Sequence, residues 1–162
     1  MNKPIQPLTA AAFAPFGDVI EAASNAKSFA INQGYTQRFH NLARVDVTQN
    51  QGSAGISIFR SAPLPMPIQI RQLERHPLSS QAFFPLSPRP YLVVVAQPGD
   101  LDETTIRIFL AQPGQGVNYH AGTWHHFCLA LEAESDFLVV DRTGGGRNCD
   151  EVELKNPFQV VL

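Results

Sequence analysis

Histidine, glutamate and glutamine side chains gather between Glu74 and Gln81 in this 162-residue chain. Glu74 and His76 are two residues apart, so they share one face of any strand that holds them. The four residues between His76 and Gln81 predict the turn of a hairpin, which would bring Gln81 alongside. Carboxylate, imidazole and amide groups all offer lone pairs. The cluster could therefore bind a metal ion or the hydrogen-bond donors of a substrate.

A second cluster contains three of the five histidines, between His120 and His126. His125 and His126 are consecutive, so on a strand their side chains would point to opposite faces. In a β-barrel, one would line the interior and the other would face outward or toward an interface. Imidazole titrates near neutral pH, which makes His120 or His125 the natural proton shuttle. Glu74 is the alternative base if burial raises its pKa.

These side chains must be positioned by β-structure, because the local pattern predicts strands almost throughout the chain. Short segments rich in Val, Ile, Phe and Tyr recur at intervals of about ten residues, which is typical of a barrel or sandwich. One short helix is expected at residues 9–14, with Thr9 or a neighbour as its cap and Pro15 as its stop. The expected strands are 55–60, 68–74, 82–86, 91–96, 105–111, 124–131 and 136–141, with 152–154 and 158–162 closing the sheet.

Length and charge indicate one ordinary folded domain spanning residues 1–162. The 12 basic and 14 acidic residues give a formal net charge of −2, so we expect neither nucleic acid nor an anionic membrane as a partner. The N-terminal segment lacks the apolar run of a secretory signal and the cysteines lack CxxC spacing, which predicts a cytoplasmic protein. Cys128 lies in an apolar run and is expected to be buried.

Both polar clusters have the spacing of the two cupin motifs, with partly different residues. The first motif reads E-x-H, then four residues, then Q, and its named positions are Glu74, His76 and Gln81. The second motif extends from Gly114 to His125 and reads G, then five residues, then HAG, then two residues, then H. The sequence therefore predicts an all-β, cupin-type and jelly-roll-like barrel with one or two short helices.

Three longer segments resemble the ureidoglycolate lyase family, formerly called ureidoglycolate hydrolases. They are LERHPLSSQAFFPL at 73–86, GVNYHAGTWHHF at 116–127 and DFLVVDRTGGGRNCD at 136–150. The resemblance covers essentially the whole chain. It implies a cupin barrel, usually a homodimer, that splits (S)-ureidoglycolate into glyoxylate and urea, a late step of allantoin and purine catabolism.

The family also implies nickel, and the four candidate ligands here are Glu74, His76, Gln81 and His125. Relative to the cupin motif, Glu74 replaces a histidine and Gln81 replaces an acidic ligand. Two imidazoles, a carboxylate and a neutral amide could hold a divalent ion such as nickel or manganese. The same groups could equally bind the substrate with no metal.

Cleavage of ureidoglycolate, an anionic hemiaminal, needs a base for its hydroxyl proton, an acid for the leaving urea nitrogen and a receptor for its carboxylate. Arginine binds a carboxylate through two parallel hydrogen bonds, and Arg60, at the end of a strand expected to face inward, is the preferred candidate. Asn118, Tyr119 and Gln81 are expected to bind the rest of the substrate. The other arginines considered are Arg38, Arg75 and Arg142.

Two other functions fit the same barrel. A non-catalytic cupin that binds a small acid needs no proton shuttle, and the paired histidines argue against it. A metal-dependent oxygenase or isomerase needs two histidines and a carboxylate, which Glu74, His76 and His125 could supply.

Two other features have open interpretations. Phe13, Phe16 and Phe29 would suit either a dimer interface or the core. The Gly144–Gly146 triplet would suit either a mobile turn or an active-site lid.

Overall fold

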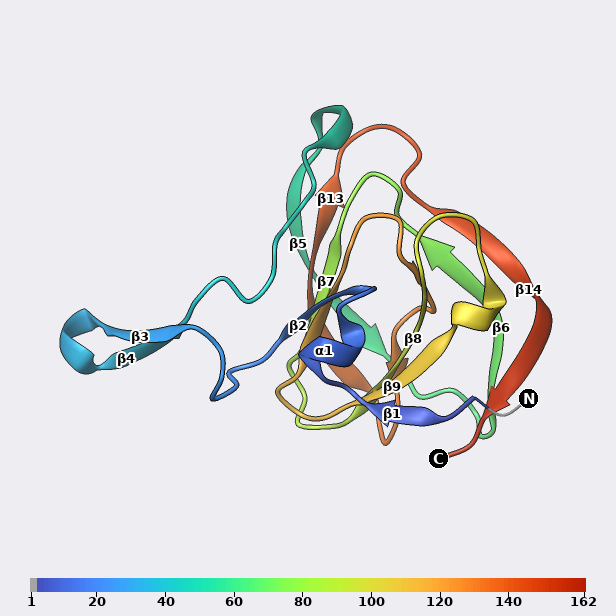
Figure 1. Cartoon of the computed structure of the whole chain (residues 1–162), viewed down its shortest axis with the longest axis horizontal. Coiled ribbons are helices and arrows are strands. Elements are labelled where there is room, and N and C mark those ends of the chain that lie inside the picture. The colour runs from blue at the N-terminus through green and yellow to red at the C-terminus, as the bar shows by residue number, and fades with distance from the viewer. Residues whose placement is uncertain (1–2) are drawn as a thin grey trace.

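The computed structural model describes residues 3–162, which form two curled sheets and a separate hairpin (Figure 1). The sheets face each other and make a half-barrel, so the prediction of an all-β, barrel-like fold is confirmed. Among these residues no helix is both long and apolar enough to cross a membrane.

The larger sheet has seven strands. In spatial order they are β1 (Ile5–Pro7), β9 (Arg107–Ala111), β8 (Tyr91–Ala96), β11 (Trp124–His125), β6 (Ile68–Arg75) and β14 (Asp150–Val160), with β12 (Leu129–Ala130) also paired to β8. The smaller sheet has five strands, in the order β2 (Gly17–Ile20), β10 (Gly116–Tyr119), β7 (Gln81–Pro85), β13 (Ser135–Thr143) and β5 (Ser53–Ser61).

The expected helix is α1 (Ala10–Phe13), and the Thr9 hydroxyl accepts a hydrogen bond from the Ala12 amide at 3.2 Å, as an N-cap does. Three short 3₁₀ turns complete the helical elements: η1 (Asn32–Gly34), η2 (Gln49–Gln51) and η3 (Glu103–Thr105).

Strand β8 shows how the apolar residues build the core. All six of its residues are buried, and alternate side chains enter two different apolar clusters. Tyr91, Val93 and Val95 face a cluster that includes Phe13, whereas the even-numbered residues face a cluster that includes Trp124. A strand buried on both faces reads as a continuous apolar run, as YLVVVA does.

Helix α1 is attached to the core by aromatic packing. Phe13 lies 5.6 Å from Phe109 and 6.3 Å from Tyr119 between ring centroids. Phe13 and Phe16 are both buried. Of the two interpretations of these phenylalanines, core packing therefore applies to Phe13 and Phe16, while Phe29 is exposed.

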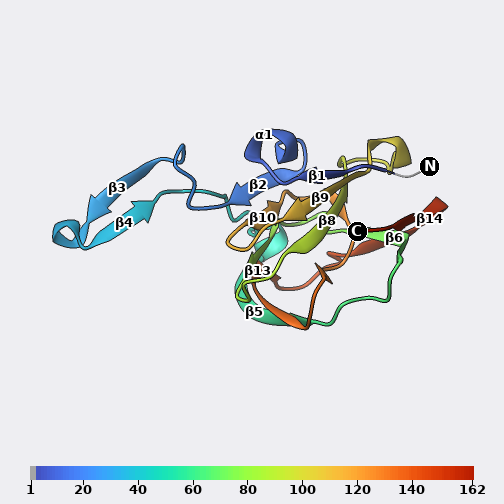
Figure 2. The same ribbon diagram turned by 90° about the horizontal axis from the view of Figure 1, so that it is seen from below.

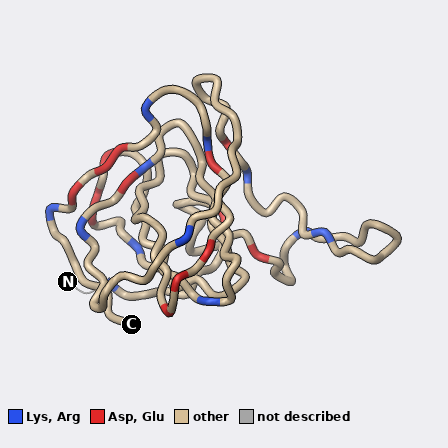
Figure 3. Tube along the Cα trace, turned by 180° about the vertical axis from the view of Figure 1, so that it is seen from behind, with Lys and Arg blue, Asp and Glu red and all other residues tan. Residues whose placement is uncertain are grey.

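Residues 28–39 form a hairpin of β3 (Ser28–Ile31) and β4 (Thr36–Phe39) that projects far from the barrel (Figures 1 and 2). The residues of this hairpin were not predicted as strands. Its tip carries no charged side chain, whereas acidic and basic residues are interspersed over the barrel (Figure 3).

Most predicted strands are present, and the exceptions have physical reasons. The predicted strand 124–131 is broken into β11 and β12, and residues 152–154 and 158–162 belong to one bulged strand, β14. The short strands β1, β2 and β10 were missed. They contain three or four residues each, too few for alternation to be visible.

Candidate functional site

Four side chains predicted to act together lie close together at one end of the barrel: Glu74, His76, Gln81 and His125. His125 of β11 stands opposite Glu74 of β6 in the sheet. Its Nδ1 lies 3.8 Å from Glu74 Oε1, and the rings of His76 and His125 have centroids 5.1 Å apart. The structure thus brings together residues from both sequence clusters.

The hairpin predicted between His76 and Gln81 is wrong, although the contact it was meant to explain exists. β6 and β7 belong to different sheets, so residues 77–80 cross from one sheet to the other. His76 Nε2 nevertheless lies 3.1 Å from Gln81 Oε1. Gly122, with a φ of +79°, forms the turn before β11, and its amide donates to the His76 carbonyl at 2.9 Å.

His125 is a neutral, deeply buried histidine. Its side chain is 1% exposed, and the Tyr119 ring stacks on it at 4.2 Å with an interplanar angle of 1°. Burial, followed by the proximity of His76, lowers the pKa of His125 from 6.5 to about 3. The ring is therefore uncharged at neutral pH.

The hydrogen bonds of His125 identify its tautomer. Nδ1 lies 3.1 Å from the His126 carbonyl, which can only accept, so Nδ1 carries the hydrogen. Nε2 then has a free lone pair, and this buried atom has no partner among the described residues. An orphaned acceptor at the end of a fixed ring is a ready ligand atom.

Glu74 has the opposite perturbation. Burial raises its pKa above 4.5, with a smaller upward effect from Glu151, while His76 lowers it. Burial also raises the pKa of Tyr119, so that phenol stays protonated. Glu74 is thus the group here whose pKa is moved toward neutrality, which is the condition under which it would serve as a base.

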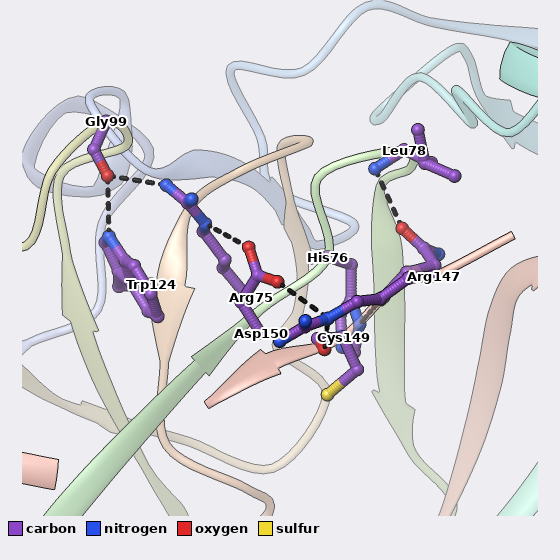
Figure 4. A network of polar contacts seen from close by, with 9 residues as sticks. Arg75, His76, Leu78, Gly99, Trp124, Arg147, Cys149 and Asp150 are labelled. Carbon is purple, nitrogen blue, oxygen red and sulfur yellow. Dashed lines mark hydrogen bonds and ion pairs between the residues drawn. The ribbon is translucent and has the colours of Figure 1, made fainter. Parts of the chain in front are cut away.

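The segment that follows β13 closes over His76. The Asn148 carbonyl lies 2.7 Å from His76 Nδ1, and its side chain accepts from the Leu78 amide at 2.8 Å and donates to Ser79 Oγ at 2.9 Å. Figure 4 shows this segment lying across the end of β6. Cys149 on the same segment is exposed, and its Sγ lies 4.0 Å from Glu74 Oε2. The cluster therefore meets solvent beside Cys149.

The residues present fit a divalent metal ion. Glu74, His76 and His125 each offer one ligand atom, and these atoms lie within 4.8 Å of one another. The unpartnered His125 Nε2 adds a lone pair that nothing else in the described chain uses. Two imidazoles and a carboxylate are a donor set that suits first-row transition metals.

The sequence of this chain is similar to known proteins over almost its whole length. The family model described as "Ureidoglycolate lyase" matches residues 2–161. The chain belongs to the ureidoglycolate lyase family. A protein of Pseudomonas aeruginosa strain LESB58 named "Ureidoglycolate lyase" is 57% identical over 159 residues, 98% of this chain and 94% of its own.

Two other relatives carry the same name. One from Pseudomonas syringae pv. tomato is 54% identical over 159 residues, 98% of this chain and 93% of its own. One from Burkholderia mallei strain NCTC 10229 is 55% identical over 150 residues, 93% of this chain and 88% of its own. Glu74, His76, Gln81 and His125 all lie inside the range that the family model matches.

Asn118 and His120 do not join the cluster. Strand alternation turns Asn118 to the other face of β10 from Tyr119, and His120, the residue after β10, lies on the same side as Asn118. His120 Nε2 lies 3.2 Å from Asp18 Oδ2, and Asn118 Nδ2 donates to the same oxygen at 3.0 Å. β2, which carries Asp18, lies so close to β10 that a Cβ on Gly17 would overlap the Asn118 carbonyl. A cavity of about 320 Å³ opens on this face, lined by Arg44, Asp46, Ser80, His120 and Ala121.

The expectation that Arg60 faces into the barrel is wrong. β5 is an edge strand, and most of its residues are exposed. The Arg60 side chain is 65% exposed and makes a two-pronged contact with Asp136 at 2.8 and 2.9 Å.

The other arginines considered are also engaged elsewhere. Arg75 bonds to Asp150 at 3.0 Å and to the Gly99 carbonyl at 2.6 Å (Figure 4). Arg38 lies over the Phe29 ring on the hairpin. Arg142 donates to the carbonyls of Gln49, Asn50 and Gly145.

Two expectations about single residues need correction. His126 does not face outward, because it is 4% exposed and its ring packs against Phe127. Cys128 is only partly buried, and burial raises its pKa to about 12. Asp141, Asn148 and Cys149 were not predicted as site residues. DFLVVD alternates in the way that would have placed Asp141 beside Gln81, but no sequence pattern marks the backbone carbonyl of Asn148.

Proposed function

We propose that this chain cleaves (S)-ureidoglycolate to glyoxylate and urea at the cluster of Glu74, His76, Gln81 and His125, within allantoin and purine catabolism. The observation that carries this proposal is 54–57% identity over almost the whole chain to proteins named ureidoglycolate lyase. The binding-protein and oxygenase alternatives lack such support.

Glu74 is the proton carrier in this proposal. Its raised pKa and its solvent access beside Cys149 suit a carboxylate that takes the hydroxyl proton of the hemiaminal as the carbon–nitrogen bond breaks. The protonated Glu74 then returns that proton to the departing urea nitrogen. No water is consumed, so the same carboxylate is restored at the end of the reaction.

His125 acts as a fixed acceptor. With a pKa of about 3 it is too weak a base to carry the proton itself, but its free Nε2 can accept a hydrogen bond from an N–H of the substrate's ureido group. The Tyr119 stack holds the ring in place. Gln81 and His76 lie on the other side of the cluster and bind the ureido group.

If a divalent ion such as nickel or manganese is bound, Glu74, His76 and His125 hold it, with Gln81 as a further oxygen donor. Such an ion would supply Lewis acidity, lowering the pKa of a bound hydroxyl. Elemental analysis of the purified protein, paired with an assay after exhaustive chelation, tests this part of the proposal. Full activity in the chelated protein would assign the cluster to direct substrate binding.

Arg147 is our candidate for the substrate carboxylate. It stands two residues before Cys149, its side chain is 80% exposed, and it pairs with Asp150 at 3.2 Å. A side chain so exposed at the solvent edge of the cluster can turn toward an anionic ligand at little cost. Arginine also matches a carboxylate with two parallel donors.

The reaction is tested by supplying purified protein with (S)-ureidoglycolate and measuring glyoxylate and urea separately. We expect the two products in a 1:1 ratio, with no oxygen uptake. Ammonia in place of urea would show a different bond cleavage, and oxygen uptake would favour the oxygenase.

We also propose a homodimer, in which the β3–β4 hairpin and the β5 edge are covered by a second copy of the chain. An isolated two-stranded hairpin is marginally stable in water, and this one exposes Tyr35 at 91%. On β5, Ile56 and Ile58 are 74% and 53% exposed, which is a liability for an uncovered edge strand. Light scattering of the purified protein should give twice the chain mass of 17.8 kDa.

A cytoplasmic location is proposed on the unpaired state of Cys128 and Cys149.

A further inference from the structure

Gln81 can point its side-chain amide in two ways, and the choice decides what the cluster offers a ligand. In the structure, Gln81 Oε1 faces His76 Nε2 at 3.1 Å and Gln81 Nε2 donates to Asp141 Oδ2 at 3.1 Å. Reversing the amide would exchange these two contacts. The residues on either side therefore determine which orientation is stable.

His76 by itself would favour the reversed amide. Its Nδ1 faces the Asn148 carbonyl at 2.7 Å and must carry a hydrogen there. In the neutral ring Nε2 is then an acceptor, and the NH₂ of a reversed Gln81 would donate to it. That bond would satisfy both residues and would remove two acceptor atoms from the cluster.

Asp141 opposes this reversal. A carboxylate only accepts hydrogen bonds, so a reversed Gln81 would turn its oxygen toward the negative charge of Asp141. The two residues are cross-strand neighbours, since the register of β13 on β7 pairs Val140 with Ala82. Gln81 is buried at 6% exposure, which makes the contact with Asp141 hard for water to replace.

We infer that Asp141 is a positioning residue that locks the Gln81 amide with its oxygen toward His76. The lock prepares two adjacent acceptors, Gln81 Oε1 and His76 Nε2, for a ligand that brings N–H groups, and on the proposed function that ligand is the ureido end of the substrate. Asp141 itself touches no substrate; it acts through Gln81.

The test compares D141N with D141L. Asparagine keeps an acceptor oxygen for Gln81 Nε2, whereas leucine has a similar size and no acceptor. We expect D141L to raise KM about tenfold with kcat changed less than about threefold, since the lost bond serves binding in both ground and transition states. D141N should restore KM to within about threefold of wild type. If D141L does not fold, D141A, which also lacks an acceptor, replaces it.

Two controls separate positioning from general damage. Q81L should raise KM as D141L does, and the Q81L/D141L double variant should be no worse than Q81L, because residues that act through one contact are not additive. D136L removes an aspartate from the same strand, outside the cluster, and should leave KM unchanged. Equal KM values for D141N and D141L, or an additive double variant, would overturn the inference.

An NMR measurement tests the orientation of the Gln81 amide independently of the reaction. In ¹H–¹⁵N spectra, the side-chain NH₂ pair of Gln81 is identified as the pair missing from Q81L. In wild type and D141N, we expect the resonances of this pair to be shifted from those of exposed glutamines and its hydrogens to exchange slowly with solvent. In D141L the resonances should move and the hydrogens should exchange rapidly. An unmoved pair in D141L would refute the lock, whatever the activity assays show. A wild-type protein inactive on ureidoglycolate, with the shift present, would instead refute only the proposed function.

Discussion

Replacement of His125 by glutamine should change how the stability of the protein depends on pH. The imidazole has a pKa of about 3 when folded and 6.5 when exposed. Between these values the unfolded chain binds a proton at this residue and the folded chain does not. Stability is therefore retained above pH 6.5 and lost as the pH falls toward 3.

The magnitude follows from the displacement of the pKa. Each pH unit below 6.5 costs about 1.4 kcal/mol for one proton. At pH 4.5 the wild-type protein should have lost about 2.7 kcal/mol through His125, which corresponds to a fall of about 5–10 °C in Tm. Because other groups titrate in the same range, the informative quantity is the difference between wild type and H125Q.

The assay is guanidinium chloride unfolding followed by circular dichroism at pH 7.0, 5.5 and 4.5, with chelator present. The gap in unfolding free energy between wild type and H125Q should shift by about 1.4 kcal/mol at pH 5.5 relative to pH 7. Y119F is the control, since it keeps a ring against His125 and adds no titration in this range. A gap that stays constant from pH 7.0 to 4.5 would refute the burial argument for His125.

Three other variants and one chemical modification test the remaining proposed roles. E74Q should lower kcat by about 10²–10⁴ with a modest change in KM, and glyoxylate release within threefold of wild type would contradict its role as proton carrier. R147Q should raise KM about tenfold with kcat retained; an unchanged KM places the carboxylate elsewhere. Iodoacetamide should modify exposed Cys149 before Cys128 and should stop turnover. The modification should be slow, because burial and Glu74 raise the pKa of Cys149. Peptide mass spectrometry locates the adduct, and a modified but active protein would show that Cys149 does not lie at the entrance to the cluster. I56K should shift light scattering to one chain mass, and a dimer that persists would remove β5 from the interface.

The sequence identified the barrel because its strands carry their own pattern. YLVVVA is buried on both faces and reads as a continuous apolar run, and β8 is found where it was expected. The short strands β2 and β10 have no such pattern and depend on their neighbours in the sheet. The β3–β4 hairpin was missed because it projects away from the barrel, whose core would otherwise impose an apolar face on its strands (Figures 1 and 2).

The site was predictable in its residue types and less so in its geometry. Alternation separates Tyr119, which stacks on His125, from Asn118 and His120, and applying it to β10 would have required recognising that four-residue strand first. Arg60 shows the converse failure. An alternating strand was expected to be inward facing, but alternation cannot distinguish an inner strand from an edge strand such as β5.

We propose that catalysis takes place at the cluster of Glu74, His76, Gln81 and His125 and not at the cavity beside His120. The direct measurement is kcat/KM for (S)-ureidoglycolate in H125A and H120A, with folding of both variants checked by Tm. We expect a loss of at least about 100-fold in H125A and a change below about fivefold in H120A. A folded H125A with wild-type turnover, or an inactive H120A beside it, would contradict the claim.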